Sequence, residues 1–484
     1  MGIFDLLRKT LSALRLEDEV YLAYLYGHRI DEHEYLRSRA CKWPGLLLRC
    51  VLFFRFLQKN YRNNEKSSNN VDCLVYSGTD NQMKSLSQVI KALHKKGMAV
   101  AIFHGETVSC DYIDSAINVR PVYFRIKEIT VASVLFFIKA PSLYLRLRKR
   151  GNKIGVSHYF NIFCESYVYL PYFFRILGET KPIFVIQSND HNISNRSLRL
   201  ASQLMGIKTV FMQHGAGTGF QPPLDFDYAF LNGEQAMKAY GYKYITLSSG
   251  ENKHPKSFNT TIFLSGQKKY LTRGKSAQAY LEKEFCVGIG VSSLNEFSLL
   301  KSLLEKLKIK NIKCIVRAHP GQSAVFLSEL RDYIENNENV LFSDPKKIQL
   351  TEFFSQCNIL IAANTSLHLD AGLVGIPSYY YELSDHALQP DYFGFEKAGL
   401  LEYFPENIYC MSDSEIKGLA VQSKKRLSAI RYYSESFNTP WEGREGELVA
   451  ETLYRMKCNS SLENIFIKES HTKCFKGIYR LMNN

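Results

Sequence analysis

The sequence predicts an α/β protein made of two tandem domains, each built on a doubly wound parallel sheet. Three observations support this prediction. The chain has 484 residues, which is too long for one ordinary hydrophobic core. Short apolar segments alternate with amphipathic helical segments in two successive series. The polar stretch SSGENKHPKSFNT, near residue 250, interrupts the alternation and predicts a linker between the series.

Residues 1–68 form a basic helical segment that precedes the first domain. In IFDLLRKTLSALRL the apolar residues recur at helical spacing, with Arg8, Lys9 and Arg15 among them. Such a helix can lie on an anionic membrane, or it can pack on its own domain. The sequence leaves both interpretations open. The polar tract NYRNNEKSSNN then predicts a linker.

Residues 69–248 carry the first alternating series. Strands are predicted at DCLVYSG, MAVAIFHG, KPIFVIQSND and IKTVFMQHG, and helices at NQMKSLSQVIKALHKKG and NRSLRLASQLMG. Strand, helix and strand at this spacing form the βαβ unit of a parallel sheet. Ligands of such sheets bind at the carboxyl ends of the strands.

Residues 258–440 repeat this pattern. The strands FCVGIGVSS, IKCIVRAHP, NVLFSD, NILIAANTS and IPSYYYEL alternate with amphipathic helical segments. The series predicts a second parallel sheet, so that the two domains face a cleft. Residues 441–484 are predicted to form a helical tail.

Charge and cysteine usage narrow the class of protein. The formal net charge of +14 predicts an anionic partner such as phosphate, nucleotide, nucleic acid or a membrane surface. The eleven cysteines show no CxxC pair, and the start of the chain shows no signal-peptide pattern, so we expect reduced thiols in a cytoplasm. The apolar runs GLLLRCVLFFRFL and ITVASVLFFIKA are too short to span a bilayer, so no transmembrane helix is expected.

Polar residues directly follow three of the predicted strands, where a parallel sheet presents its ligands. One strand ends in the first domain, at TVFMQ, and two end in the second, within CIVRAHPGQ and LIAANTS. The residues at these three ends are His214, Arg317, His319, Pro320, Asn364, Thr365 and Ser366.

These residue types suit a transfer reaction that involves phosphate. A helix beginning after NTS offers backbone N–H groups and a hydroxyl to phosphate oxygens. Arg317 and protonated His319 could neutralise a departing phosphate, and His214 could take the proton from an acceptor hydroxyl. The structural alternatives are a histidine packed at a strand end and a plain helix cap at Thr365 or Ser366.

Glycines accompany two of the strand ends. GIGVSS, which contains Ser292, resembles a phosphate loop but lacks the third fingerprint glycine and the P-loop spacing. In VFMQHGAGTGF, Gly215 and Gly217 would let an acceptor approach the backbone beside His214. We therefore expect the acceptor at the first domain and the donor phosphate at the second.

The tandem domains and these motifs resemble GT-B transferases of bacterial surface-polysaccharide synthesis. The families concerned are the capsular polysialyltransferases, the Kdo transferases of capsule assembly and the CDP-glycerol glycerophosphotransferases. The resemblance covers roughly residues 180–395 and rests on short motifs. The matching positions are His214-Gly215, His319-Pro320, Thr365-Ser366 and, as the counterpart of a glycerophosphotransferase aspartate, Asp370. Polysialyltransferases carry an acidic pair before the glycine, whereas this chain has QHG, which favours a histidine base.

The resemblance implies transfer of a sugar from a CMP-, CDP- or UDP-linked donor to a capsule or lipopolysaccharide type of glycan. The acceptor would be lipid-linked or a glycan, and the enzyme would lie peripherally on the inner face of the cytoplasmic membrane. No DxD follows a strand of the second domain, so neither a metal nor another cofactor is expected. One alternative is transfer of polyol phosphate from a CDP-polyol. Another is a non-catalytic nucleotide or nucleic-acid binder, but the basic residues lack the aromatic interleaving of a strand-binding surface, so we expect no nucleic-acid partner.

Overall fold

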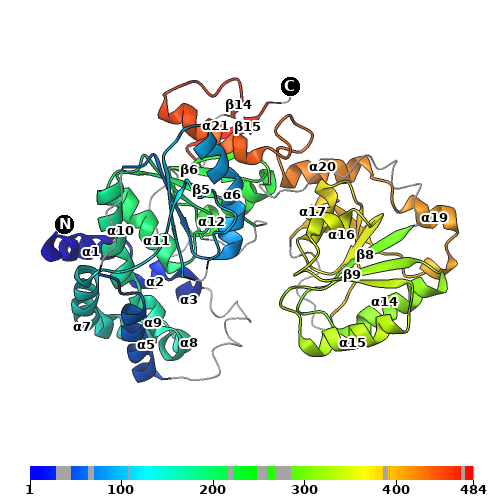
Figure 1. The fold of residues 1–484 in the computed structure, drawn as a ribbon, viewed down its shortest axis with the longest axis horizontal. Helices are drawn as coiled ribbons and strands as arrows, with labels where there is room; N and C mark the ends of the chain where they lie inside the picture. Colours follow the sequence, from blue (N-terminus) through cyan, green and yellow to red (C-terminus); the bar gives the residue numbers. More distant parts are fainter. Residues whose placement is uncertain are drawn as a thin grey trace.

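Two parallel sheets form the protein in the computed structural model. The structure describes residues 1–28, 45–63, 70–106, 108–215, 222–247, 259–267, 285–384, 391, 393–469 and 475–482. Their topology confirms the expected α/β class with two tandem Rossmann-like domains of the GT-B type. Figure 1 shows the two domains side by side, joined near helix α20 (Lys424–Tyr433).

The first sheet has nine strands in the order β14-β15-β7-β6-β5-β4-β1-β2-β3. All neighbours are parallel except β14 and β15, which pair antiparallel. The strands are β1 (Cys73–Ser77), β2 (Val100–His104), β3 (Asn118–Pro121), β4 (Phe184–Gln187), β5 (Lys208–Met212), β6 (Tyr228–Leu231), β7 (Thr261–Leu264), β14 (Phe466–Glu469) and β15 (Gly477–Leu481).

Helices bury the sheet on both faces, which is why its central strands are continuous apolar runs. In β1, Leu74 and Tyr76 pack into a core with the N-terminal helices, whereas Cys73 and Val75 pack into the opposite core. The first core contains α1 (Ile3–Leu16), α2 (Glu19–Leu22), α3 (Tyr24–His28), α5 (Leu46–Lys59), α7 (Ile126–Lys149), α8 (Lys153–His158), α9 (Phe160–Cys164), α10 (Ser166–Thr180) and α11 (Ile193–Leu204). The second contains α6 (Asp80–Lys95) and α21 (Glu445–Lys457), and α12 (Glu234–Leu247) packs on β6 and β7.

The N-terminal helices are part of this domain, which corrects the expected appendage at residues 1–68. Leu6 and Leu14, on the apolar face of α1, are buried in the core that also holds Tyr76. That face is therefore not available to a membrane. The sequence allowed this helix either to lie on a membrane or to pack on its own domain, and in the structure it packs on the domain.

The C-terminal part of the chain also belongs to the first domain. The expected boundary at residue 258 placed Thr261–Leu264 in the second domain, but this strand, β7, pairs with β6. The expected helical tail, residues 441–484, contains α21 and then the hairpin of β14 and β15, and β15 pairs with β7. Pairing between strands far apart in sequence overrides the local pattern.

The second sheet has six parallel strands in the order β10-β9-β8-β11-β12-β13. They are β8 (Cys286–Gly290), β9 (Lys313–Arg317), β10 (Val340–Ser343), β11 (Ile359–Ala362), β12 (Ser378–Tyr380) and β13 (Leu401–Tyr403). The helices that cover them are α14 (Phe297–Ile309), α15 (Ala324–Glu335), α16 (Leu350–Phe354), α17 (Leu367–Leu373), α18 (Phe395–Ala398), the 3-10 helix η2 (Ile408–Cys410), α19 (Asp413–Gly418) and α20.

Two glycines of the first domain allow the returning chain to lie against it. A Cβ on Gly233 would lie 2.7 Å from the carbonyl oxygen of Tyr432, at the end of α20. Gly266 has a φ of +82°, and a Cβ there would overlap the side chain of Ser436. The backbone N–H of Glu435 donates to the carbonyl of Asn232 at 2.8 Å. The junction between the domains is therefore closely packed.

The sequence predicted no helix long enough to span a membrane, but helix α7 is longer than the apolar run that it contains. With 24 residues it extends the run ITVASVLFFIKA at both ends, and by length and composition it could cross a membrane. It is the sole helix of that kind in the part of the chain that the structure describes. One side of it, including Val131, Leu135 and Leu143, is buried in the first domain.

Candidate functional site

The strand order of the second sheet identifies where a ligand would bind. Numbered by chain order, it is 3-2-1-4-5-6, which is the doubly wound order that reverses between its first and fourth strands. These are β8 and β11, which pair with Gly290 beside Ala362. Ser292 follows β8, and Asn364, Thr365 and Ser366 follow β11. Four of the predicted residues therefore lie at the switch point, the usual crevice for ligands in such sheets.

The His319 loop adjoins this crevice. The Gln322 side chain donates from Nε2 to the carbonyl of Ser292 at 2.9 Å, which ties the two loops together. His319 and Pro320 are exposed at the end of β9. The backbone N–H of Gly321 donates to His319 Nδ1 at 3.0 Å. In the neutral ring Nε2 then carries the proton, so this nitrogen can donate to a ligand oxygen.

A buried histidine lies near the start of α17, the helix that follows β11 at this crevice. His368, in α17, donates from Nε2 to the carbonyl of Ala363 at 2.9 Å. Burial lowers the pKa of His368 to about 4, so the ring is neutral at physiological pH. Ser366 stands at the N-cap of α17 but makes no side-chain capping bond, whereas Thr365 Oγ1 accepts from the N–H of Leu367 at 3.4 Å. The capping alternative therefore does not apply to the Ser366 hydroxyl.

Two predicted donor-binding residues have other contacts. Arg317 donates from one nitrogen to Ser343 Oγ and to the carbonyl of Ile348, both at 3.0 Å. These partners belong to β10 and the loop after it, on the side of β9 away from β8. Burial lowers the pKa of Arg317, and the nearby Asp344 carboxylate raises it by a smaller amount. The structure therefore does not bring Arg317 to the switch point.

Asp370 is a junction residue. It is buried, and its Oδ1 accepts from Gln267 Nε2 of the first domain at 2.9 Å. The backbone N–H of Gln267 also donates to Ser434 Oγ, next to α20, at 2.9 Å. Because Gln267 follows β7 and Asp370 follows β11, these bonds bring the carboxyl edges of the two sheets together at this point.

The first sheet has its own switch point, which the sequence analysis missed. Its order reverses between β1 and β4, where Tyr76 lies beside Gln187. Gln187 ends β4, Asp190 lies in the loop after it and Asn195 lies in the first turn of α11, and all three are at least nine-tenths buried. Both polar atoms of the Gln187 and Asn195 side chains, and Asp190 Oδ2, make no hydrogen bond to any residue that the structure describes.

More such atoms continue along this edge towards the second domain. The side-chain oxygens Asn232 Oδ1, after β6, and Gln267 Oε1, after β7, are also buried without a hydrogen-bond partner within the described residues. Buried polar atoms are seldom left unpaired in native proteins, because each costs about 1–3 kcal/mol. A row of them at the ligand-binding edge therefore indicates a site for a polar ligand.

Asp190 is held in a defined orientation. His191 Nδ1 lies 3.1 Å from Asp190 Oδ1, and His191 Nε2 lies 3.2 Å from Asn189 Nδ2. Since an amide nitrogen can only donate, Nε2 accepts and Nδ1 donates to the carboxylate. Asp190 Oδ2 thus remains to accept a hydrogen bond from a ligand hydroxyl.

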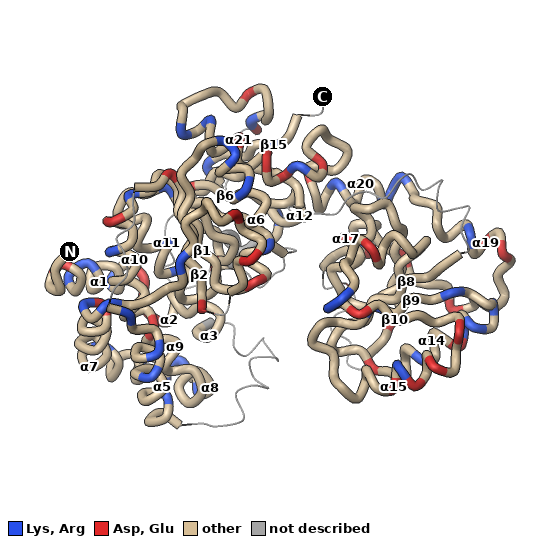
Figure 2. Tube along the Cα trace, in the orientation of Figure 1, with Lys and Arg blue, Asp and Glu red and all other residues tan. Residues whose placement is uncertain are grey.

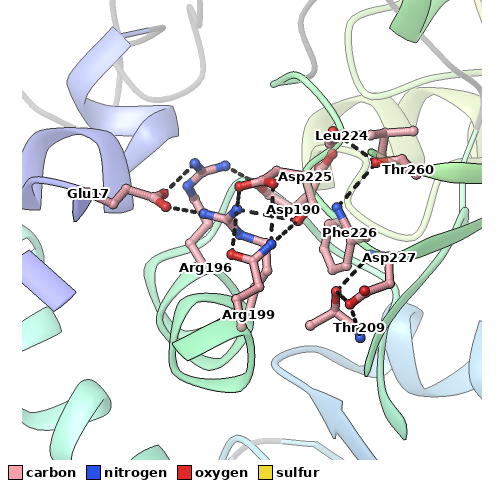
Figure 3. Close-up of polar contacts among 11 residues, drawn as sticks. Glu17, Asp190, Arg196, Arg199, Thr209, Leu224, Asp225, Phe226, Asp227 and Thr260 are labelled. Carbon is pink, nitrogen blue, oxygen red and sulfur yellow. Dashed lines mark hydrogen bonds and ion pairs between the residues drawn. The ribbon is translucent and has the colours of Figure 1, made fainter. Parts of the chain in front are cut away.

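A buried ion-pair network supports this loop from the N-terminal helix (Figure 3). Glu17, just after α1, pairs with Arg196 at 2.6 Å and also with Arg199. Burial opposes ionisation of Glu17, but the two arginines overcome it and lower its pKa. Arg196 in turn donates to the carbonyl of Asp190 at 2.9 Å, and Arg199 pairs with Asp225.

The predicted base, His214, is one strand away from Asp190. Gln187 in β4 lies beside Phe211 in β5, so the residues that follow these two strands share one edge. Gln213 fixes the turn, because its side chain donates to the carbonyl of Gly215 at 2.7 Å and accepts from the N–H of Asn232 at 2.8 Å. His214 is half-buried, and Gly215 is exposed, with no atom of a described residue within 4 Å of a Cβ placed there. Gly217 lies outside the described residues.

Among the described residues, no group of three or more His, Cys, Asp or Glu side chains is arranged to hold a metal ion. The cysteines in that part of the chain are free thiols. The groups that could act on a ligand at the two switch points are therefore amides, hydroxyls, imidazoles and one carboxylate.

Comparisons with known proteins find similarity in fold alone. No protein-family model and no curated protein sequence matches the chain. Among solved structures, a UDP-N-acetylglucosamine 2-epimerase is 13% identical over 85% of this chain and 100% of its own, with a TM-score of 0.47. The UDP-GlcNAc 2-epimerase of Neisseria meningitidis, bound to UDP-GlcNAc, is 14% identical over 79% and 99%, with a TM-score of 0.45. MurG of Acinetobacter baumannii is 13% identical over 80% and 100%, with a TM-score of 0.44.

Proposed function

We propose that the protein is a glycosyltransferase that moves a sugar from a nucleotide-activated donor to a hydroxyl of an acceptor. The donor phosphates would bind at the switch point of the second sheet and the acceptor at that of the first. The observation that carries this proposal is the set of buried polar atoms at Gln187, Asp190 and Asn195 that have no hydrogen-bond partner among the described residues. Amides and a carboxylate in such a position match the hydroxyl groups of a sugar or polyol.

His214 would take the proton of the acceptor hydroxyl, and Asp190 Oδ2 would orient that hydroxyl by accepting a hydrogen bond. On the donor side, His319 would donate from Nε2 to a phosphate oxygen, and the hydroxyls of Ser292 and Ser366 would donate to the same group. These donors would stabilise the charge that develops as the nucleotide leaves. The reaction as proposed uses no metal and no cofactor.

The acceptor proposed is a lipid-linked or capsule-like glycan at the inner face of the cytoplasmic membrane. This part of the proposal rests on the motif resemblance and on the formal charge of +14, which favours an anionic surface.

Turnover assays with donor panels test the function. The protein would be incubated with CMP-, CDP- and UDP-linked sugars and glycan acceptors, and the released nucleotide and the acceptor mass would be measured. We expect His214→Ala to lower turnover by about 10²- to 10⁴-fold with donor affinity unchanged, as for loss of a general base. His319→Ala should weaken donor binding as well.

His94→Ala, on α6, serves as the matched control because His94 lies at the end of α6 away from the strand ends. Wild-type turnover by His214→Ala would mean that His214 is not the base. No product with any donor, together with no thermal stabilisation by any of the nucleotides, would reject the proposed function.

The alternative is transfer of polyol phosphate from a CDP-polyol. The segment ANTSLHLDAG favours it, because it resembles the glycerophosphotransferase segment. The mass of the acceptor product separates the two, since a polyol phosphate adds phosphorus and a sugar does not. Conversion of a UDP-sugar in the absence of any acceptor would instead point to epimerase chemistry.

A further inference from the structure

Two neighbouring helices of the first domain expose a continuous apolar surface. On α7 the exposed side chains include Val134, Phe137, Ile138 and Leu145, which recur at helical spacing and so share one face. On α5, Leu47 is 84% exposed and Val51 is 63% exposed. The rings of Phe54 on α5 and Phe137 on α7 lie 6.2 Å apart, so the two stripes adjoin. We call this surface the α5–α7 face.

A cavity opens in this face between the two helices. Its volume is about 440 Å³. Its lining is apolar and includes Leu46 from α5, and Phe137, Ala140 and Leu145 from α7. A cavity of this kind suits a hydrocarbon chain, because its surface is almost entirely apolar, although Tyr144 and Cys50 are among the lining residues.

Packing keeps α7 in the fold even though its length could span a membrane. Leu135, Leu143 and Leu147, on its other side, are completely buried in the first domain. Inserting the helix across a bilayer would expose that core. The exposed stripe can instead rest on a membrane surface, with the helix axis in the plane of the interface.

The charged residues of α5 and α7 themselves are almost all positive (Figure 2). Arg55 on α5 and Lys127, Arg148 and Lys149 on α7 are exposed. The single acidic residue of the two helices is Glu128, which is completely buried and accepts from Arg175 at 2.9 Å. Large apolar side chains bordered by Lys and Arg match an anionic phospholipid surface.

We propose that the α5–α7 face is a docking site for a bilayer that contains anionic phospholipid. The exposed leucine, isoleucine and phenylalanine side chains enter the boundary between headgroups and acyl chains, the basic residues contact the phosphates, and the cavity takes one acyl chain. This inference names the surface by which the proposed membrane-bound transferase would reach its acceptor, and to that extent it rests on the proposed function. Figure 1 places α5 and α7 at the end of the first domain far from the second domain.

Vesicle binding by the full chain tests this inference without any turnover. The probe is co-sedimentation with vesicles of phosphatidylglycerol and phosphatidylcholine in equal parts, compared with phosphatidylcholine alone. We expect preferential binding to the anionic vesicles that weakens as salt is raised. Arg148→Gln and Lys149→Gln should each weaken it about fivefold, the effect of one basic residue near such a surface.

Apolar variants separate the face from charge in general. The double variant Leu47→Ser and Phe137→Ser should weaken binding at least about tenfold, since it removes two large side chains from the interface. The control is Ile309→Ser with Val325→Ser, two second-domain positions that are each 70% exposed. Ala140→Trp, which would fill the cavity, should abolish binding of a soluble short-chain phosphatidylglycerol.

Absence of binding to anionic vesicles, or equal binding by the double variant and its control, would overturn the inference. A dimer that the double variant dissociates, without vesicle binding, would assign the face to a second copy of the chain and would also overturn it. Turnover of a soluble acceptor is measured separately. Loss of vesicle binding would therefore contradict the docking site but not the proposed function, and absence of turnover would contradict the proposed function but not the docking site.

Discussion

At the scale of single residues, unpaired polar atoms are the most informative feature of the molecule. Gln187 and Asn195 are completely buried, yet neither side chain bonds to a described residue. Asp190 has one oxygen bonded to His191 and one without a partner in the part of the chain that the structure describes. A folded protein tolerates such a cluster where a ligand completes it.

Replacing Asp190 tests the role assigned to its free oxygen. Asp190→Asn keeps the size of the side chain and removes a charged acceptor, whose hydrogen bond contributes about 1.5–3 kcal/mol. We therefore expect kcat/KM for the acceptor to fall about 10- to 100-fold, with the KM for the donor unchanged. Glu335→Gln, an exposed change on α15, is the control. An equal fall in both acceptor and donor parameters would show a general loss of structure instead.

His368 makes stability depend on pH. Burial lowers its folded pKa to about 4, whereas the unfolded value is about 6.5, so the unfolded chain binds the proton first as pH falls. Its stabilising contribution is complete above pH 6.5 and is lost as pH falls towards 4. Between pH 7.5 and pH 5 the free energy of unfolding should drop by about 2 kcal/mol from this residue.

Denaturant unfolding of the wild type and of His368→Gln at both pH values isolates this effect. Glutamine can still donate to the carbonyl of Ala363, to which His368 donates, but it does not titrate. The variant should lose about 2 kcal/mol less than the wild type over this range. Identical losses would show that His368 is protonated in the folded state.

At the scale of elements, the returning segment that includes α20 joins the domains. Helix α20 packs on α17 of the second domain and on α12 of the first. The residues just after it continue along the first domain, where Gly233 and Gly266 leave room for their backbone and side chains. This segment therefore joins the two domains close to the strand ends that carry the candidate site.

Gly266→Ala should destabilise this junction. The substitution places a Cβ against Ser436 and also requires a φ of +82°, which disfavours any residue other than glycine. Gly375→Ala is the matched control, because Gly375 has a φ of +86° but nothing within 4 Å of a Cβ. We expect Gly266→Ala to lower the free energy of unfolding by about 1–3 kcal/mol more than the control, the range for overpacking. Equal losses in denaturant unfolding would mean that the junction readily opens.

At the scale of the whole molecule, the chain passes from the first domain to the second and back again. Local patterns predicted strands at β1, β2, β4 and β5 and at β8 to β12, and all of these are present. The same patterns placed β7 in the second domain and read the β14–β15 hairpin as part of a helical tail, because the sheet that a strand joins is decided by partners far away in the sequence.

The residues of the candidate site, like the strands, could be predicted from the sequence only in part. Ser292, His319 and the Asn364–Ser366 segment could be recognised from polar residues that follow apolar strands. Asp190 follows an apolar strand too, in IQSNDHN, and that signal could have found it. What raises its importance is the reversal of strand order beside β4, which no local pattern reveals.

The sequence by itself determined the class of fold, the positions of most central strands and the polar strand ends of the second domain. It could do so because apolar periodicity and turn chemistry act over a few residues. Only the tertiary structure decided the strand order, the return of the C-terminal hairpin to the first sheet, and the separation of Arg317 from the switch point. Those features depend on hydrogen bonds and burial between segments far apart in the chain. Many strand pairings would satisfy the same local pattern, but only one of them buries both faces of each sheet.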